Sequence, residues 1–199
     1  MTRIKMCGLR SEADIDYANR VRPEFVGFVF VPGSKRYITY RAAAALHSSL
    51  NEGILSVGVF ADVPPDYAAD LVSYGIIDFI QLHGHENNGY IADLRGLTHA
   101  PVIQAFQVKG EADIIAADHS DADIVLLDSG AGSGEMFDHS LLSSINRPYI
   151  LAGGLTAENI GSIVKKFAPF AVDVSSAIET DGIKDYRKMK AFADAVRDI

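Results

Sequence analysis

The sequence predicts an α/β fold, a single-domain (β/α)₈ or TIM barrel with a parallel eight-stranded sheet over residues 1–199. Three observations predict it: eight short apolar runs rich in β-branched residues, helix-like segments between them, and an even spacing. Each unit has roughly 25 residues, enough for one strand, one helix and two short loops. Eight such units satisfy a closed barrel, whereas a doubly wound open sheet usually needs fewer strands.

The elements follow in strict alternation along the chain. The expected strands are the apolar runs at residues 4–7, 25–31, 55–60, 79–82, 102–106, 124–127, 149–151 and 170–174. The expected helices lie between and after them, at residues 12–20, 40–50, 65–74, 88–97, 111–117, 137–144, 157–166 and 185–196. The segments at 111–117 and 137–144 carry the weakest helix signal.

Composition and charge exclude several classes of function. The chain has 18 Lys and Arg against 26 Asp and Glu, a formal net charge of −8, so it lacks the basic surface that nucleic-acid binding needs. Charges interrupt its first residues, and no apolar stretch approaches the roughly 18 residues of a membrane span, so we expect a cytoplasmic protein without membrane partners. One cysteine excludes an internal disulfide and a cysteine-rich metal site.

The first strand alternates polar and apolar side chains. If Ile4 and Met6 face the helices, then Arg3, Lys5 and Cys7 face the barrel interior. Catalytic groups of this architecture collect at the C-terminal ends of the strands, where Cys7 stands. The ammonium of Lys5 would lower the cysteine pKa from about 8.5 and make the thiol a usable base or nucleophile. The alternative is that Cys7 is only a small buried hydrophobe.

The sixth strand ends in a carboxylate, Asp128, which points inward together with Ile124 and Leu126. Desolvation at an apolar strand end would raise its pKa and let it act as a general acid. The alternative is a capping role in the following loop. The glycine-rich residues 130–134 lack the spacing of a dinucleotide fingerprint, which argues against a nicotinamide cofactor.

The seventh and eighth strands end in small residues that suit phosphate binding. Gly153 and Gly154 follow the seventh strand, and the sequence Ser175-Ser176-Ala177 follows the eighth. Loops after strands 7 and 8 are the usual phosphate cradle of such barrels, because their backbone N–H groups can approach a ligand closely. Each residue taken alone could serve turn chemistry only. Their coincidence at adjacent strand ends favours the cradle.

Two further side chains stand at strand ends. Arg36 follows the second strand and could clamp a substrate carboxylate through paired N–H bonds. His83 closes the fourth strand. A solvated charge and a structural imidazole are the corresponding alternatives. Because the net charge of −8 repels anions at long range, an anionic substrate needs such local donors.

The ordered motifs of this chain resemble the phosphoribosylanthranilate isomerase family of tryptophan biosynthesis, nearly from end to end. The motifs are Lys5-Met6-Cys7-Gly8, Gly27-Phe28-Val29-Phe30, Ser34-Lys35-Arg36-Tyr37, Val57-Gly58-Val59-Phe60, Gln81-Leu82-His83-Gly84, Leu127-Asp128-Ser129, Leu151-Ala152-Gly153-Gly154-Leu155 and Val172-Asp173-Val174-Ser175-Ser176. Any one of them is weak evidence, but the ordered set is specific.

The resemblance implies a cofactor-free and metal-free Amadori rearrangement of N-(5-phosphoribosyl)anthranilate to the 1-deoxyribulose phosphate. Asp128 would protonate the furanose ring oxygen to open the ring to a Schiff base, and Cys7 would take the C2 proton. Arg36 would hold the anthranilate carboxylate. The remaining substrate-binding residues would be the phosphate ligands Gly153, Gly154, Ser175, Ser176 and Ala177 and the pocket residues His83 and Asp173.

Three residues depart from the family pattern: Ala131, His139 and Ala177.

Two alternative functions stay open. One is the related barrel isomerase of histidine biosynthesis, which acts on a larger two-phosphate substrate and uses a carboxylate in place of Cys7. The other is a phosphate-binding barrel without catalysis. In each case the expected partner is a small phosphorylated molecule, and the expected assembly is a monomer or homodimer.

Overall fold

The structure, a computed structural model, describes residues 1–130 and 138–199, and it contains a closed barrel of eight parallel strands. The strands are β1 (Arg3–Cys7), β2 (Phe25–Val29), β3 (Leu55–Phe60), β4 (Phe79–Leu82), β5 (Val102–Gln107), β6 (Ile124–Asp128), β7 (Tyr149–Ala152) and β8 (Ala171–Val174). The barrel closes where β1 pairs with β8, with Lys5 opposite Asp173 in the register. The predicted fold class is therefore confirmed.

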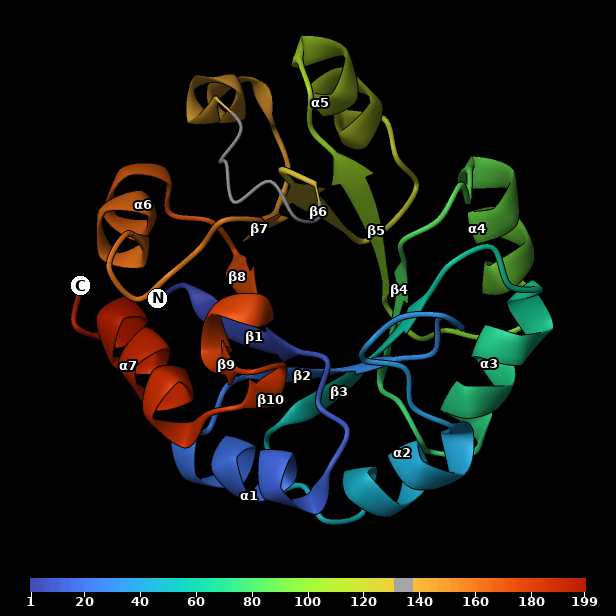
Figure 1. The fold of residues 1–199 in the computed structure, drawn as a ribbon. Coiled ribbons are helices and arrows are strands. Elements are labelled where there is room, and N and C mark those ends of the chain that lie inside the picture. The colour runs from blue at the N-terminus through green and yellow to red at the C-terminus, as the bar shows by residue number, and fades with distance from the viewer. Residues whose placement is uncertain (131–137) are drawn as a thin grey trace.

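Helices form a ring around the strands (Figure 1). They are α1 (Glu12–Val21), α2 (Tyr40–His47), α3 (Pro65–Ser73), α4 (Asn88–Arg95), α5 (Glu111–Asp118), α6 (Ile160–Phe167) and α7 (Tyr186–Arg197), with the short 3₁₀ helices η1 (His139–Ser144) and η2 (Ser176–Ile178). A small antiparallel hairpin, β9 (Glu179–Thr180) and β10 (Ile183–Lys184), precedes α7. The hairpin was not predicted.

Side-chain caps begin several of these helices. At α1, the Ser11 hydroxyl accepts a hydrogen bond from the Asp14 N–H, and the Asp14 carboxylate accepts one from the Ser11 N–H. This capping box satisfies donors that the first turn of a helix leaves free. Asp185 caps α7 in a similar way through the N–H groups of Arg187 and Lys188.

Several predicted boundaries were wrong; for example, the helix expected over 40–50 ends at His47. The second strand ends at Val29 instead of residue 31, because the chain leaves the sheet there toward α2. The helix expected over 157–166 begins at Ile160, since the Asn159 side chain accepts from the Thr156 N–H and holds a turn before it. The segment expected as a helix over 137–144 is 3₁₀ from His139 to Ser144. Residue 137, Ala131 and the side chain of His139 lie outside the described residues.

The apolar side chains form two main layers. An outer layer between the sheet and the helices contains Ile4 and Met6. An inner layer fills the barrel with Phe25, Val57, Ile103, Ile124, Leu126, Ile150, Ala152 and Ala171. Lys5 is buried on the opposite face of β1 from Ile4 and Met6, as the alternation predicted. A third, smaller apolar cluster contains Cys7, Val29 and Val59 at the C-terminal ends of β1, β2 and β3.

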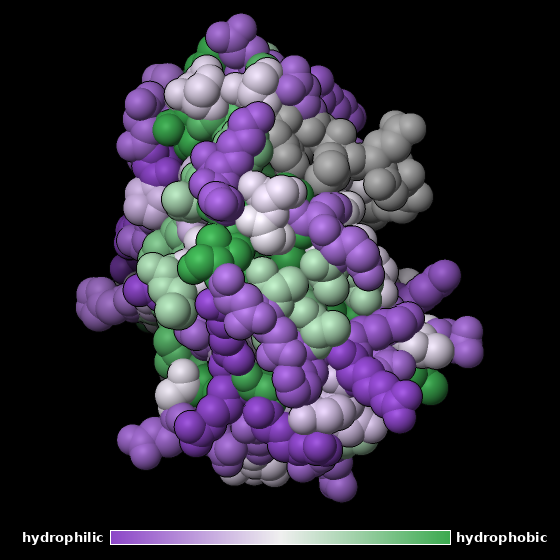
Figure 2. Space-filling view, turned by 90° about the vertical axis from the view of Figure 1, so that its left-hand side faces the viewer, coloured by the Kyte–Doolittle hydropathy of each residue, from purple (hydrophilic) through white to green (hydrophobic). Residues whose placement is uncertain are grey.

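The side of the molecule that carries α6 and α7 is mostly polar, with a smaller group of apolar side chains among the charged ones (Figure 2). A hollow of about 350 Å³ near both chain ends is lined by Met1, Thr2, Arg3, Val164, Ala168, Pro169, Phe170, Val196, Arg197 and Ile199. None of the predicted site residues lines this hollow. Among the described residues, no helix is both long and apolar enough to span a membrane.

Candidate active site

Cys7 ends β1 and faces the mouth of the barrel. Its side chain packs against Val29, Val59 and Val31, and only 9% of the residue is exposed. A Cβ atom on Gly27 would lie 2.6 Å from the Cys7 Sγ, so the glycine on the neighbouring strand leaves room for the thiol. The placement of Cys7 at the C-terminal strand ends is confirmed.

Beneath the thiol lies a buried ion pair. Lys5 is fully buried, and its Nζ donates to Asp173 Oδ1 at 3.0 Å across the β1–β8 pair. The two side chains meet because they are register partners on the same face of the sheet. Burial alone would lower the pKa of Lys5, but its attraction to Asp173 and Cys7 raises that pKa above the usual value. Lys5 therefore remains an ammonium below the thiol.

The expected pKa shift of Cys7 was wrong in its direction. Burial raises the pKa of the thiol above its usual value, and the opposing effects of Lys5 and Lys184 are smaller. Desolvation penalises a thiolate because the surrounding apolar groups replace water. The neighbouring ammonium thus limits the rise in the pKa but does not reverse it.

Asp128 ends β6 on the same mouth of the barrel. Its inward direction is confirmed, since Ile124 and Leu126 of the same strand lie in the inner layer. The Gly130 N–H donates to Asp128 Oδ1 at 3.0 Å, and a Cβ on Gly153 would come within 2.7 Å of that oxygen. The side chain is 21% exposed, so the expected apolar burial is only partial.

Asp173 connects the thiol and the carboxyl sides of the mouth. It pairs with Lys5, and it also interacts electrostatically with Asp128 and His83. His83 Nε2 lies 4.0 Å from Asp128 Oδ2, while its Nδ1 lies 3.1 Å from Gln81 Nε2. Cys7 and Asp128 are therefore brought to one mouth, with the Asp173 and His83 side chains beside them.

The glycines after β7 and the serines after β8 form adjacent loops. Gly153 and Gly154 have φ angles of +85° and +64°, a backbone conformation that favours glycine. The Asn159 amide donates to the Gly154 carbonyl at 2.8 Å and fixes this turn. After β8, the Ser175 hydroxyl donates to the Cys7 carbonyl at 3.0 Å, and η2 begins at Ser176. The two loops follow neighbouring strands, β7 and β8, and their role as a phosphate cradle stays a prediction.

Arg36 is paired with a residue that the sequence reasoning missed. Its Nε and Nη2 donate to Glu179 Oε1 and Oε2 at 2.7 and 2.8 Å, a bidentate ion pair. Lys184 also binds Glu179 Oε1, at 2.7 Å. Burial opposes ionisation of Glu179, but its bonds to Arg36 and Lys184 lower the pKa to about 2. The sequence did carry a signal for this hairpin, because Asp181-Gly182 is a preferred hairpin turn.

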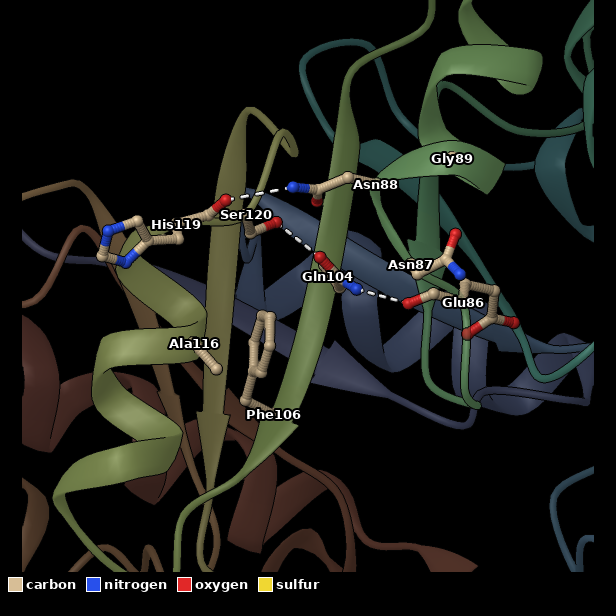
Figure 3. Close-up of a pocket in the computed structure, with 9 residues that line it drawn as sticks. All are labelled: Glu86, Asn87, Asn88, Gly89, Gln104, Phe106, Ala116, His119 and Ser120. Carbon is tan, nitrogen blue, oxygen red and sulfur yellow. Dashed lines mark hydrogen bonds between the residues drawn. The ribbon is translucent and has the colours of Figure 1, made fainter.

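A separate cavity of about 560 Å³ lies on the outside of the barrel, between α4 and α5 (Figure 3). Gln104 spans its floor, donating to the Glu86 carbonyl at 2.6 Å and accepting from the Ser120 hydroxyl at 2.5 Å. None of the predicted site residues lines it. Within the described residues, no group of three or more His, Cys, Asp or Glu side chains could hold a metal ion.

The closed barrel, with a thiol and a carboxyl group at its C-terminal mouth, defines a (β/α)₈ enzyme equipped for acid–base chemistry. A family model described as N-(5'phosphoribosyl)anthranilate (PRA) isomerase matches residues 4–195. The chain belongs to this family.

Named relatives and solved structures agree with that assignment. An N-(5'-phosphoribosyl)anthranilate isomerase of Endomicrobium trichonymphae is 41% identical over 194 residues, covering 95% of both chains. The corresponding protein of Caldanaerobacter subterraneus is 37% identical over 206 residues and the full length of both. The phosphoribosyl anthranilate isomerase structure from Thermotoga maritima superposes with a TM-score of 0.91 at 34% identity over all of both chains. A structure of such an enzyme with reduced 1-(o-carboxyphenylamino)-1-deoxyribulose 5-phosphate gives a TM-score of 0.89 at 33% identity, again over both full chains.

Proposed function

We propose that this chain isomerises N-(5'-phosphoribosyl)anthranilate to 1-(2-carboxyphenylamino)-1-deoxyribulose 5-phosphate, with Asp128 as general acid and Cys7 as general base. Its family is an isomerase family of tryptophan biosynthesis. The observation that carries the residue assignment is the meeting of Cys7 and Asp128 at one mouth of the barrel, with Asp173 beside both. A base and an acid on opposite sides of a bound sugar are what the rearrangement requires.

The proposed chemistry begins with two proton transfers that involve side chains of the protein. Asp128 gives its proton to the ring oxygen, the bond between C1 and that oxygen breaks, and the nitrogen lone pair forms a Schiff base. Cys7 then removes the proton from C2, which yields an enolamine. The enolamine becomes the ketone as C1 gains a proton and the C2 hydroxyl loses one. The thiol must ionise for its step, and the Lys5 ammonium beneath it favours that form against the effect of burial.

Substrate binding is assigned to donors around the mouth. Arg36 receives the anthranilate carboxylate, because its guanidinium lies near Cys7 and interacts with it electrostatically. The loops containing Gly153, Gly154 and Ser175-Ser176-Ala177 hold the phosphate through backbone N–H groups and hydroxyls. His83 and Asp173 line the sugar between these ends. Such local donors are needed because the net charge is −8.

The remaining assignments are also proposals. Residues 1–199 act as one domain in the cytoplasm, on a small phosphorylated substrate, without cofactor and without nucleic acid as a partner. The assembly is a monomer or a homodimer. A Thermotoga maritima relative is described as a dimeric phosphoribosylanthranilate isomerase from which monomers were made.

The test is turnover by the purified protein. We expect it to consume phosphoribosylanthranilate without added metal or nucleotide, seen as loss of the substrate's fluorescence, and to leave the two-phosphate substrate of the histidine-biosynthesis isomerase unchanged. Folding is checked by circular dichroism. A folded protein that binds the phosphosugar but does not convert it would overturn the enzyme assignment in favour of a phosphate-binding barrel.

A further inference from the structure

The β9–β10 hairpin contacts three of the loops that surround the mouth. Glu179 of β9 binds Arg36, which lies in the loop after β2. Lys184 of β10 donates to the Ser175 carbonyl after β8 at 3.0 Å. Arg10, after β1, donates to the Gly182 carbonyl of the hairpin turn and to the Lys35 carbonyl. The hairpin therefore links the loop that carries Arg36 to the loop proposed for phosphate.

The pairing with Glu179 leaves one edge of the Arg36 guanidinium open. A guanidinium has five N–H donors in a planar fork, and Glu179 occupies the edge formed by Nε and Nη2. No described residue accepts a hydrogen bond from Nη1. The edge formed by Nη1 and Nη2 can therefore receive a second carboxylate through two parallel hydrogen bonds.

The position of the Arg36 side chain is also set by Gly8. This glycine has a φ of +83°, and a Cβ atom there would lie 2.3 Å from Arg36 Cδ. The aliphatic part of Arg36 thus lies directly over the backbone after Cys7. Glu179 determines how the planar head group is turned at the end of this side chain.

Glu179 is itself held firmly. Its side chain is only 9% exposed, and the buried Lys184 ammonium donates to the same Oε1 that Arg36 contacts. The carboxylate stays ionised over the working pH range because its pKa is about 2. A fixed anion with two cationic partners is suited to orient one of them for a ligand.

We propose that Glu179, supported by Lys184, is a positioning residue that orients Arg36 and thereby selects substrates with a carboxyl group ortho to the amine. This inference rests on the proposed function, in which Arg36 binds that carboxyl group. Glu179 does not touch the substrate. Its effect passes through the orientation of the guanidinium.

A substitution can separate orientation from charge. Glu179→Gln removes one negative charge and makes the surroundings of Arg36 more positive. If charge alone governed binding, a carboxylated ligand would bind more tightly to this variant. If orientation governs binding, the ligand binds more weakly although the site is more positive. The sign of the change therefore distinguishes the two mechanisms.

The experiment uses two probes in calorimetry: reduced 1-(o-carboxyphenylamino)-1-deoxyribulose 5-phosphate and the same compound without the o-carboxyl group. We expect Glu179→Gln to lower the affinity for the carboxylated probe by about tenfold to a hundredfold, which is the usual effect of losing charge-assisted hydrogen bonds. The affinity for the carboxyl-free probe should change by less than about twofold. In turnover, KM for the substrate should rise while kcat stays within a few-fold. Glu52→Gln, an exposed residue before β3, is the matched control.

The outcomes separate this inference from the proposed function. If Arg36→Met leaves binding of the carboxylated probe unchanged, the carboxylate role of Arg36 is wrong. If Arg36→Met weakens binding but Glu179→Gln does not, only the positioning role of Glu179 is overturned. Equal weakening of both probes would show a structural effect and would also overturn it. Glu179→Asp keeps the charge but shortens the side chain, so if the glutamine variant does not fold, weaker binding of the carboxylated probe alone by this variant supports orientation, and unchanged binding overturns it.

Discussion

The two proposed proton-transferring groups, Cys7 and Asp128, lie in different surroundings on the two sides of the barrel mouth. On the thiol side, Cys7 is 9% exposed and lies above the fully buried Lys5. On the carboxyl side, the Asp128 side chain is 21% exposed and accepts from a backbone N–H, that of Gly130. The first side combines apolar burial with buried charge, and the second combines partial exposure with a backbone donor.

The difference shows that a nearby charge is not sufficient to decide the pKa of a buried group, because desolvation also contributes. Burial raises the pKa of Cys7 although cationic side chains oppose the rise. Gly27 has no side chain and lets the thiol sit this deep, since a Cβ would approach Sγ to 2.6 Å. The close packing that places Cys7 at the end of β1 therefore also removes the water that would stabilise its thiolate.

The largest expected effect comes from removing the proton-transferring groups themselves. We expect Cys7→Ala and Asp128→Asn each to lower kcat by about 10²- to 10⁴-fold, the usual contribution of general acid–base groups. Both variants should keep the barrel, because neither change introduces a larger side chain. Steady-state turnover with a matched unfolding curve measures this. A near-normal rate in either variant would remove the role assigned to that residue.

The eight strands could be predicted because each is a short apolar run and the runs recur at an even spacing. The alternation along β1 also predicted which side of the strand faces the barrel, and Lys5 and Cys7 lie there. Strand-end placement then brought together residues as distant in sequence as Cys7 and Asp128. Local pattern and barrel topology together were sufficient for this part of the site.

Quantities that depend on packing could not be predicted in the same way. The sign of the Cys7 pKa shift follows from how much water the folded barrel excludes, and the sequence does not state this. Glu179 was missed because its partner Arg36 is 143 positions away. The Asp181-Gly182 turn indicated a hairpin, but nothing local indicated which loop the hairpin would contact.

The next largest effect tests the ion pair beneath the thiol. Lys5→Met removes the ammonium that lowers the Cys7 pKa, so that pKa should rise further. The acid limb of the profile of kcat/KM against pH should move to higher pH, with activity at neutral pH falling by about tenfold. Measuring kcat/KM between about pH 6 and about pH 10 would show the shift. An unchanged acid limb would mean that Cys7 is not the titrating base.

The same substitution should also affect stability, because it leaves Asp173 buried without its partner. Breaking such a pair costs about 3–5 kcal/mol. The double variant Lys5→Met/Asp173→Asn should recover part of that loss, and the exposed Lys165→Met is the matched control.

The stability of the wild-type protein should depend on pH through Cys7. Because its pKa is raised in the folded state, Cys7 contributes stability below the pKa of the unfolded thiol. That stabilisation is lost as the pH rises through the folded value.

The smallest effect is expected at His83, on the carboxyl side. Its Nε2 lies 4.0 Å from Asp128 Oδ2, too far for a hydrogen bond, and its side chain is 43% exposed. A contact of this length between partly exposed groups contributes about 0–1 kcal/mol, so His83→Asn should lower kcat/KM by no more than about fivefold. The Gln81 amide nitrogen lies 3.1 Å from Nδ1, so that ring nitrogen has a partner of its own and Nε2 is the one that faces Asp128. If His83→Asn instead matched the loss in Asp128→Asn, the two side chains would act as one proton-donating unit. The carboxyl side would then depend on a coupled pair, as the thiol side depends on Lys5.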